Sequence, residues 1–212
     1  MSDKALPDDV ATDREEPKVR HRMKPGQRRE QILQTLAGML EQPGAERITT
    51  ALLASKLDVS EAALYRHFAS KAQMFEGLID FIEHSVFGLV NQIAEREGDG
   101  TSKAMRMVTV LLQFGEKNPG MARVMVGDAL VFEHERLHQR MNQLFDRIES
   151  VLRQVLREAA EANKSASPTA DAQVRASVLM AFALGQLQRF TRSGFKRSPL
   201  DHAEASLALM CR

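Results

Sequence analysis

Apolar residues recur at steps of three and four along nearly the whole chain after Pro25-Gly26, and this spacing predicts helices rather than strands. The first helix should begin after Gly26 and end at Pro43-Gly44. On one face it carries Ile32, Leu33, Leu36, Met39 and Leu40. No window alternates between apolar and polar residues over enough length to predict a sheet. The pattern therefore predicts an all-α fold with about nine helices.

Long helices dominate the later part of the chain. One should start after Ser70, where Ser70 and Gln73 have the spacing of a capping box, and end before Gly98. Ser-Pro pairs suit the cap and first position of a helix, so Ser167-Pro168 and Ser198-Pro199 predict two further helix starts. The other helices are expected over about 101–117, 121–126 and 129–162.

Two short apolar segments, 49–57 and 60–68, lie before the long helices and predict two short helices joined by a tight turn. Thr49 is placed to cap the first of them and Ser60 the second. Leu53, Leu57, Val59, Leu64 and Phe68 can close a small core between the two helices.

The second short helix exposes an unusual set of residues. Ala62 and Ala63 would let its first turn approach another molecule closely, and Tyr65, Arg66 and His67 would then offer hydrogen bonds outward. A helix that reads the major groove of DNA needs these properties. A helical hairpin inside a bundle has the same spacing, so both interpretations stay open at this point.

The distribution of charged residues along the chain is more informative about DNA binding than the net charge. Lys and Arg number 29 against 28 Asp and Glu, and the formal net charge of +1 argues against a protein that coats nucleic acid by bulk charge. The first 13 residues are acidic, whereas the charged residues of segment 18–29 are all basic. That basic run fits a solvated tail and an arm that contacts phosphates equally well.

Composition excludes several classes of protein. The single cysteine, Cys211, rules out a disulfide within the chain and any cysteine-cluster metal site. No apolar run is long enough to cross a bilayer, and the N-terminus lacks the apolar centre of a secretory signal. We therefore expect a cytoplasmic protein that does not contact the membrane.

Thr49-Thr50, Val59-Ser60, Leu64-Tyr65, His67-Phe68 and Ser70-Lys71 together resemble the helix-turn-helix signature of the TetR family of transcriptional regulators. The resemblance implies a homodimer, paired through its last two long helices, that binds palindromic sites in double-stranded DNA. It implies a helix-turn-helix domain over 26–71 and a regulatory and dimerisation domain over 72–212. Residues 1–25 hold few large apolar residues, so we expect a disordered tail there, longer than the resemblance requires. By position, the DNA contacts would be Thr49, Thr50, Ser60, Ala62, Ala63, Tyr65, Arg66, His67 and Lys71.

Motifs further along the chain are similar to the nucleoid occlusion branch of the same family. They comprise Phe114–Gly120, Asn142–Phe145 and Leu152–Glu158. This resemblance implies a nucleoid-associated protein that binds chromosomal sites, engages the C-terminal tail of the division protein FtsZ and inhibits its ring over the nucleoid. Further assembly of the dimers on DNA stays open.

The resemblance also implies a docking groove for the FtsZ tail, between the helix of Phe81 and the helix that ends near Lys117. The candidate residues are Phe81, Val110, Gln113, Phe114, Lys117 and Asn118. An acidic and apolar tail would need an apolar slot with a cation at its rim, and Lys117 could supply the cation. The alternative is that Phe81, Val110 and Phe114 belong to the core.

Two other functions compete with this one. A ligand-responsive repressor is the commoner role in the family, and abundant Met and Phe could line a pocket for a small molecule. Separately, residues 134–138 fit the H-E-x-x-H motif of zinc hydrolases. Charged neighbours and the lack of a third ligand nearby favour a solvated helix face instead. We expect no enzyme, no cofactor and no metal.

One position departs from the family pattern. Asp58 stands in the turn between the two short helices, where the family usually has Gly. Asp tolerates a left-handed backbone better than most residues, so the turn should survive the substitution.

Overall fold

The computed structural model describes residues 26–42, 47–96 and 98–211. Within these residues it forms nine α-helices and no strand, with a 3-10 helix between α6 and α7, which confirms the all-α fold. In chain order the elements are α1 (Gln27–Leu40), α2 (Thr50–Lys56), α3 (Glu61–Tyr65), α4 (Lys71–Ala94), α5 (Gly100–Lys117), α6 (Pro119–Met125), η2 (Asp128–Leu130), α7 (Glu135–Ala162), α8 (Pro168–Arg192) and α9 (Ala203–Met210). The predicted tail, 1–25, and the Pro43-Gly44 helix stop lie outside the described residues.

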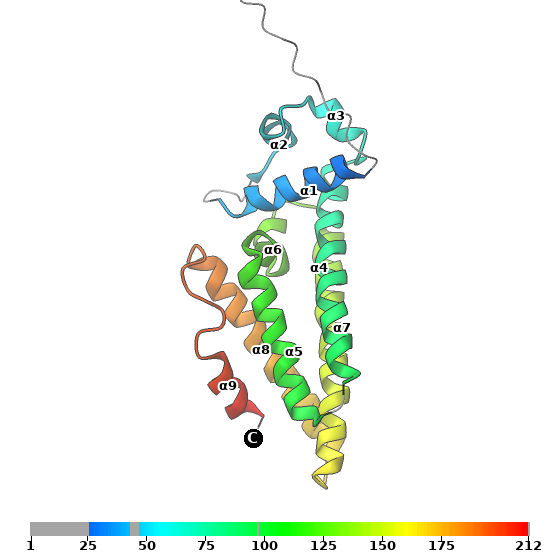
Figure 1. The fold of residues 1–212 in the computed structure, drawn as a ribbon, viewed down its shortest axis with the longest axis vertical. Coiled ribbons are helices and arrows are strands. Elements are labelled where there is room, and N and C mark those ends of the chain that lie inside the picture. The colour runs from blue at the N-terminus through cyan, green and yellow to red at the C-terminus, as the bar shows by residue number, and fades with distance from the viewer. Residues whose placement is uncertain (1–25, 43–46, 97, 212) are drawn as a thin grey trace, which may run out of the picture.

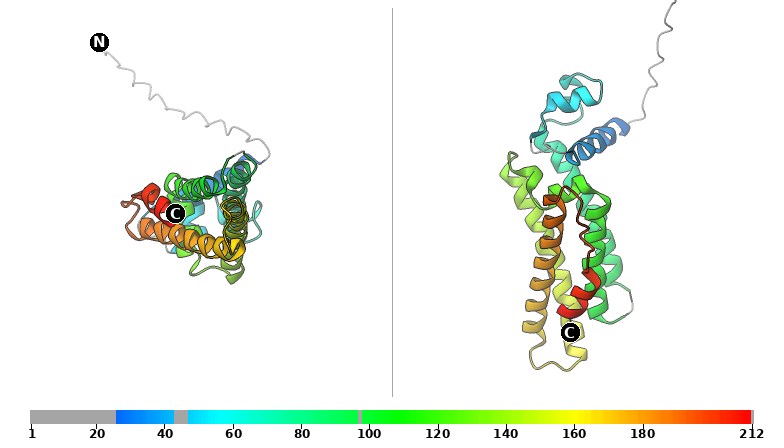
Figure 2. Two further views of the ribbon diagram at one scale, coloured as in Figure 1. Left: turned by 90° about the horizontal axis from the view of Figure 1, so that it is seen from below. Right: turned by 90° about the vertical axis from the view of Figure 1, so that its left-hand side faces the viewer.

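Helices α1, α2 and α3 lie together at one end of an elongated molecule (Figure 1). The long helices α4, α5, α7 and α8 run along its long axis and form a bundle. α7 and α8 pack on each other, and α4 and α5 both contact α7. Figure 2 shows the α7–α8 connection at the end of the bundle that is far from α1–α3. No described helix is long and apolar enough to cross a membrane.

One hydrophobic core joins the two ends of the molecule. α1 buries Ile32, Leu36, Met39 and Leu40, which is the predicted face. α4 passes from α1 down to α5 and α7, and it buries apolar residues at helical spacing along its whole length. Because each such side chain contributes ~1.5–3 kcal/mol relative to exposure, α4 fixes the position of α1–α3 on the bundle.

The predicted helix starts at Ser70 and at Ser167-Pro168 are confirmed in position. Ser70 Oγ accepts a hydrogen bond from Gln73 N (3.2 Å) and caps α4. The capping box is not closed, however, because Gln73 Oε1 accepts from Ala69 N (2.6 Å), one residue too early. Ser167 precedes α8 and Pro168 is its first residue, although the Ser167 side chain makes no capping hydrogen bond.

Two predicted boundaries are wrong. The long helix expected from residue 129 begins at Glu135, because Gly127 takes a left-handed φ of 85° and the 3-10 turn η2 follows it. The last helix begins at Ala203 rather than at Ser198-Pro199. The Ser198 hydroxyl accepts from Leu200 N (3.1 Å) within a turn and donates to a carboxylate oxygen of Glu116 on α5, but the helix does not begin there.

Close backbone packing of α6 on α1 connects the α1–α3 end to the bundle. A Cβ added at Gly120 would lie 2.2 Å from the carbonyl oxygen of Ala37, so only glycine permits this approach. Arg123 of α6 donates from Nη1 to Leu40 O (3.2 Å) and Gln42 O (3.4 Å). These carbonyls are left free at the C-terminus of α1, so Arg123 satisfies them.

Candidate functional site

α2 and α3 form a capped helix-turn-helix pair. Thr49 Oγ1 accepts a hydrogen bond from Leu52 N (3.2 Å) and caps α2, and Ser60 Oγ accepts from Ala63 N (3.3 Å) and caps α3. Both predicted caps are thus confirmed. Asp58, in the turn, has a φ of 53°, the left-handed conformation that was expected to be tolerated there.

A small core and one polar contact hold α3 against α2. Leu53, Leu64 and Phe68 are each 1% exposed. On the surface, Thr50 Oγ1 donates to Glu61 Oε2 (2.5 Å) and links the first turns of the two helices. With α3 held from behind and along its side, its outward side chains keep a fixed spacing.

The outer side of α3 presents polar groups that have no partner within the described residues. Tyr65, the only Tyr of the chain, is 45% exposed. Arg66 and His67 are also exposed, and neither Tyr65 nor Arg66 has a side-chain hydrogen bond or ion pair with another described residue. Seven of the predicted DNA contacts lie on or just after α3 or at the two caps: Thr49, Ser60, Ala62, Ala63, Tyr65, Arg66 and His67.

The end of the basic run supports α3 from behind. Arg29 donates from Nη1 to the carbonyl oxygen of His67 (2.9 Å), and its guanidinium lies 4.1 Å from the centre of the Phe68 ring. Arg28 donates to Gln31 Oε1 (2.8 Å). No local pattern indicated the Arg29 contact, because the two residues that it joins are 38 positions apart. The rest of the run, residues 18–24, lies outside the described residues.

Lys71 is the predicted contact that differs from the others. It is the first residue of α4, is half-buried, and its ammonium pairs with Glu133 Oε1 at 2.5 Å. The same ammonium lies 5.7 Å from the centre of the Phe75 ring. No local pattern indicates Glu133 as the partner of Lys71, since only the tertiary fold brings these two residues together.

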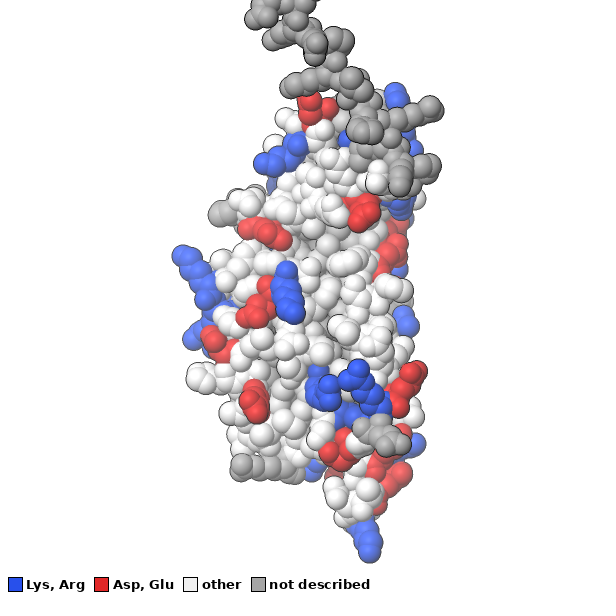
Figure 3. Space-filling model, viewed as in Figure 1, with Lys and Arg blue, Asp and Glu red and all other residues white. Residues whose placement is uncertain are grey.

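The residues of the predicted groove lie on α4 and along α5 to its C-terminus, and Figure 3 presents the side of the molecule where these two helices face the viewer. Charged side chains are sparse over the middle of this side (Figure 3). Phe81 of α4 is 48% exposed, and its ring centre is 6.1 Å from that of Phe114 on α5, which is 8% exposed. The core alternative therefore holds for Phe114 and fails for Phe81.

The other groove candidates follow α5 to its end. Val110 is half-buried, and Gln113 and Lys117 are exposed. Asn118 is half-buried and donates from Nδ2 to Phe114 O (2.8 Å), so it closes the C-terminus of α5. The candidates thus combine an apolar floor with one exposed cation.

α8 carries a second apolar surface. Val174 and Val178 are 63% and 45% exposed, and Ala181 and Gly185 continue the row at helical spacing. Exposed small and apolar residues at this spacing form a stripe on which a second helix can pack. We call these four residues the α8 stripe.

The histidines of the H-E-x-x-H motif bind the backbone. His134 Nδ1 accepts a hydrogen bond from Arg136 N (3.2 Å) and caps α7. His138 is half-buried, and its Nε2 lies 2.9 Å from the carbonyl oxygen of Leu130. Among the described residues, no group of three or more His, Cys, Asp or Glu could hold a metal ion.

The expected solvated face around this motif is in part wrong. Arg136 pairs with Glu76 (2.8 Å), and Arg140 pairs with Glu83 (2.7 Å) and Asp80 (2.5 Å), so the arginines bind α7 to α4. These carboxylates raise the pKa of the Arg140 guanidinium above its usual range, mainly through the Glu83 hydrogen bond. The charges that flank the motif thus serve helix packing.

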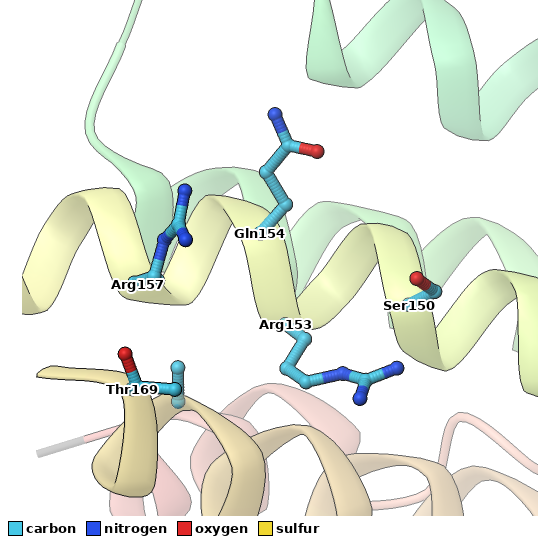
Figure 4. A pocket seen from close by; sticks show the side chains of 6 residues that line it. Ser150, Arg153, Gln154, Arg157 and Thr169 are labelled. Carbon is cyan, nitrogen blue, oxygen red and sulfur yellow. The ribbon is translucent and has the colours of Figure 1, made fainter.

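A polar cavity of about 210 Å³ lies between the far ends of α7 and α8, lined by Ser150, Arg153, Gln154, Arg157, Thr169 and Ala172. Its side chains do not converge (Figure 4). Arg157 and Gln154 point to the opposite side from Arg153, and Arg153 donates to Gln173 Oε1 (2.9 Å).

Two protein families match this chain, one over the helix-turn-helix end of the molecule and one over the helical bundle. Residues 32–78 match the family of bacterial regulatory proteins of the tetR type, and residues 99–212 match the SlmA-like family of tetracyclin repressor-like C-terminal domains. The solved structure of the TetR family regulator PfmR from Thermus thermophilus superposes with a TM-score of 0.71 at 22% identity, covering 87% of this chain and 95% of that one. At this identity the likeness shows the fold.

Full-length relatives are much more similar. The chain is 50% identical over 183 residues to the nucleoid occlusion factor SlmA of Idiomarina loihiensis, covering 86% of this chain and 93% of that protein. It is 51% identical over 184 residues to the SlmA of Klebsiella pneumoniae, covering 86% and 92%. With half of its residues shared over nearly the whole of these proteins, the chain belongs to the SlmA family of nucleoid occlusion factors, a branch of the non-enzymatic TetR-type regulators.

Proposed function

We propose that the chain binds DNA through α3 as a homodimer and, from its chromosomal sites, engages the C-terminal tail of FtsZ and inhibits ring assembly over the nucleoid. The observation that carries the DNA part is the pair of exposed, unpartnered polar groups on Tyr65 and Arg66, on a helix fixed from behind by Leu64 and Phe68. The protein would then act in the cytoplasm, at the nucleoid.

Each proposed DNA contact follows from its place in the helix pair. Ala62 and Ala63 let the first turn of α3 enter the major groove, while Tyr65, Arg66 and His67 reach base edges or phosphates. Thr49 and Ser60 lie at the caps. Thr50 and Lys71 complete the predicted set, and both would have to exchange a carboxylate partner for DNA.

The α8 stripe supports the homodimer. Two copies that pack α8 on α8, with α7 alongside, would cover Val174 and Val178, which a single chain leaves in water. A two-fold dimer presents two copies of α3, so its site in DNA should be palindromic, with half-sites about one helical turn (roughly 34 Å) apart.

Phe81 supports the FtsZ part of the proposal. The Phe81 ring, left half in water against Phe114, and the half-buried Val110 of α5 would give an apolar peptide segment a place to dock. The ammonium of Lys117 can meet an acidic residue of the tail. Gln113, Phe114 and Asn118 would form the remainder of this groove.

Genome-wide mapping of the bound sites is the decisive experiment. Many dispersed palindromic sites that avoid the replication terminus would support nucleoid occlusion. A few promoter sites beside a transporter would instead support the ligand-responsive repressor and overturn the proposal.

Fluorescence anisotropy with a labelled peptide of the FtsZ C-terminal tail tests the partner directly. The titration is made with the full chain bound to a duplex taken from the mapped sites. Absence of binding under these conditions would refute the division role and leave DNA binding standing.

A further inference from the structure

Two neighbouring residues of one loop hold two cations at the DNA-binding end of the molecule. The loop joins η2 to α7. The Phe132 ring lies under the guanidinium of Arg47, at 5.5 Å from the ring centre, and Glu133 pairs with Lys71. Arg47 comes just before α2, and Lys71 is the first residue of α4. The bundle thus contacts the helix-turn-helix segment on both of its flanks through this loop.

The Lys71–Glu133 pair is more shielded from water than an ordinary surface ion pair. The Glu133 side chain is only 9% exposed and that of Lys71 is 29% exposed. Attraction between opposite charges grows as water is excluded, and a buried carboxylate that loses its cation is strongly disfavoured. Lys71 therefore cannot leave Glu133 without a cost.

DNA bound to α3 would bring phosphates to this pair. The backbone N–H groups in the first turn of α4 and the Lys71 ammonium would both suit a phosphate. A phosphate would also bring negative charge toward the Glu133 carboxylate, which little water solvates. Lys71 thus has two competing anionic partners, one inside the protein and one on DNA.

We propose that Glu133 is a built-in competitor of the DNA backbone for Lys71, and that it sets the affinity of the chain for DNA. In the free protein Lys71 stays on Glu133, and in the complex it exchanges the carboxylate for a phosphate. Of the cations around α3, Lys56 and Arg66 have no such partner within the described residues. The inference rests on the proposed DNA binding.

The test measures how the chain binds a labelled duplex of arbitrary sequence, because a phosphate contact does not depend on sequence. Anisotropy titrations at several salt concentrations give the slope of log K against log salt. Glu133→Gln keeps the shape of the side chain and removes its charge. It should tighten binding several-fold at every salt concentration and leave the slope unchanged, because Lys71 contacts a phosphate in the complex of either chain. Lys71→Gln, which loses that contact, should make the slope shallower by about 0.9.

Controls separate this effect from a general loss of negative charge. Glu135→Gln removes an exposed carboxylate two residues away that makes no ion pair within the described residues, and it should change the affinity much less than Glu133→Gln does. In a Lys71→Gln background, Glu133→Gln should no longer tighten binding. Glu133→Asp, which withdraws the carboxylate by one methylene, is the second variant if Glu133→Gln does not fold.

The outcomes are distinct. Unchanged affinity in folded Glu133→Gln would overturn the proposal. Weaker binding would also overturn it and would make Glu133 a residue that positions Lys71 for DNA. Failure of the unmodified chain to bind any duplex, or any mapped site, would instead refute the proposed DNA binding itself.

Discussion

The contact of α6 with α1 predicts that a substitution which stabilises most helices will destabilise this protein. In Gly120→Ala the new Cβ would lie 2.2 Å from the carbonyl oxygen and 3.1 Å from the carbonyl carbon of Ala37. Normal contact distances are about 3.5–4.0 Å, so α6 and α1 would have to separate by about 1 Å or more. The clashing atoms belong to the backbone and cannot rotate away.

The magnitude follows from two opposing effects. Overpacking of this kind costs about 1–3 kcal/mol, whereas replacing a helical glycine by alanine gains up to about 1 kcal/mol. Gly120→Ala should therefore lower the free energy of unfolding by about 1–2 kcal/mol. The matched control is Gly38→Ala in α1, where the added Cβ meets nothing within 4 Å, and which should raise stability by about 0.5–1 kcal/mol.

The assay is thermal or urea unfolding followed by far-ultraviolet circular dichroism, because the chain has no Trp. Protein concentration is held constant, since a dimer makes Tm depend on it. For a chain of this size, 1 kcal/mol corresponds to roughly 2–4 °C in Tm. If Gly120→Ala unfolds at or above the Tm of the unmodified chain while Gly38→Ala behaves as expected, the close contact is refuted.

Three further predictions test the proposed interfaces. Tyr65→Ala and Arg66→Ala should each weaken binding to a mapped site by about 1–3 kcal/mol in anisotropy titrations, and retained affinity would place the interface elsewhere. Phe81→Ala should abolish binding of the FtsZ tail peptide with little change in Tm, because its ring is 48% exposed. Phe114→Ala should lose peptide binding too, but because this ring is buried it should in addition lower the free energy of unfolding by about 3–5 kcal/mol. If the Phe81→Ala chain still binds the peptide, the groove is ruled out. Val178→Glu should shift the chain to monomer in sedimentation velocity, since it puts a charge in the α8 stripe. Ala205→Glu on the exposed side of α9 is its control, and a persistent Val178→Glu dimer would contradict the α8 interface.

Local sequence was sufficient for most of the helices and for the helix-turn-helix pair. The apolar face of α1, the caps at Thr49 and Ser60 and the left-handed turn at Asp58 all depend on residues within four positions of each other. Helix periodicity and capping act over that same distance, so a single sequence contains the information. The outward side chains of α3 could be named for this reason, before any tertiary structure was known.

Only the tertiary structure decided which of these side chains are available and which have partners. Lys71 and Glu133 lie 62 positions apart, and Arg29 and His67 lie 38 apart, so no local pattern could pair them. Exposure is also decided by the tertiary structure. Phe81 and Phe114 share helical spacing with core residues, yet Phe81 is 48% exposed and Phe114 only 8%. The helix start after Gly127 differs from the prediction because apolar periodicity continues through a turn. The Ser-Pro signal at Ser198 opens a turn instead, and α9 begins only at Ala203. Packing between residues distant in the sequence determines which side chains are paired and which are buried, so these properties can be read only from the completed fold.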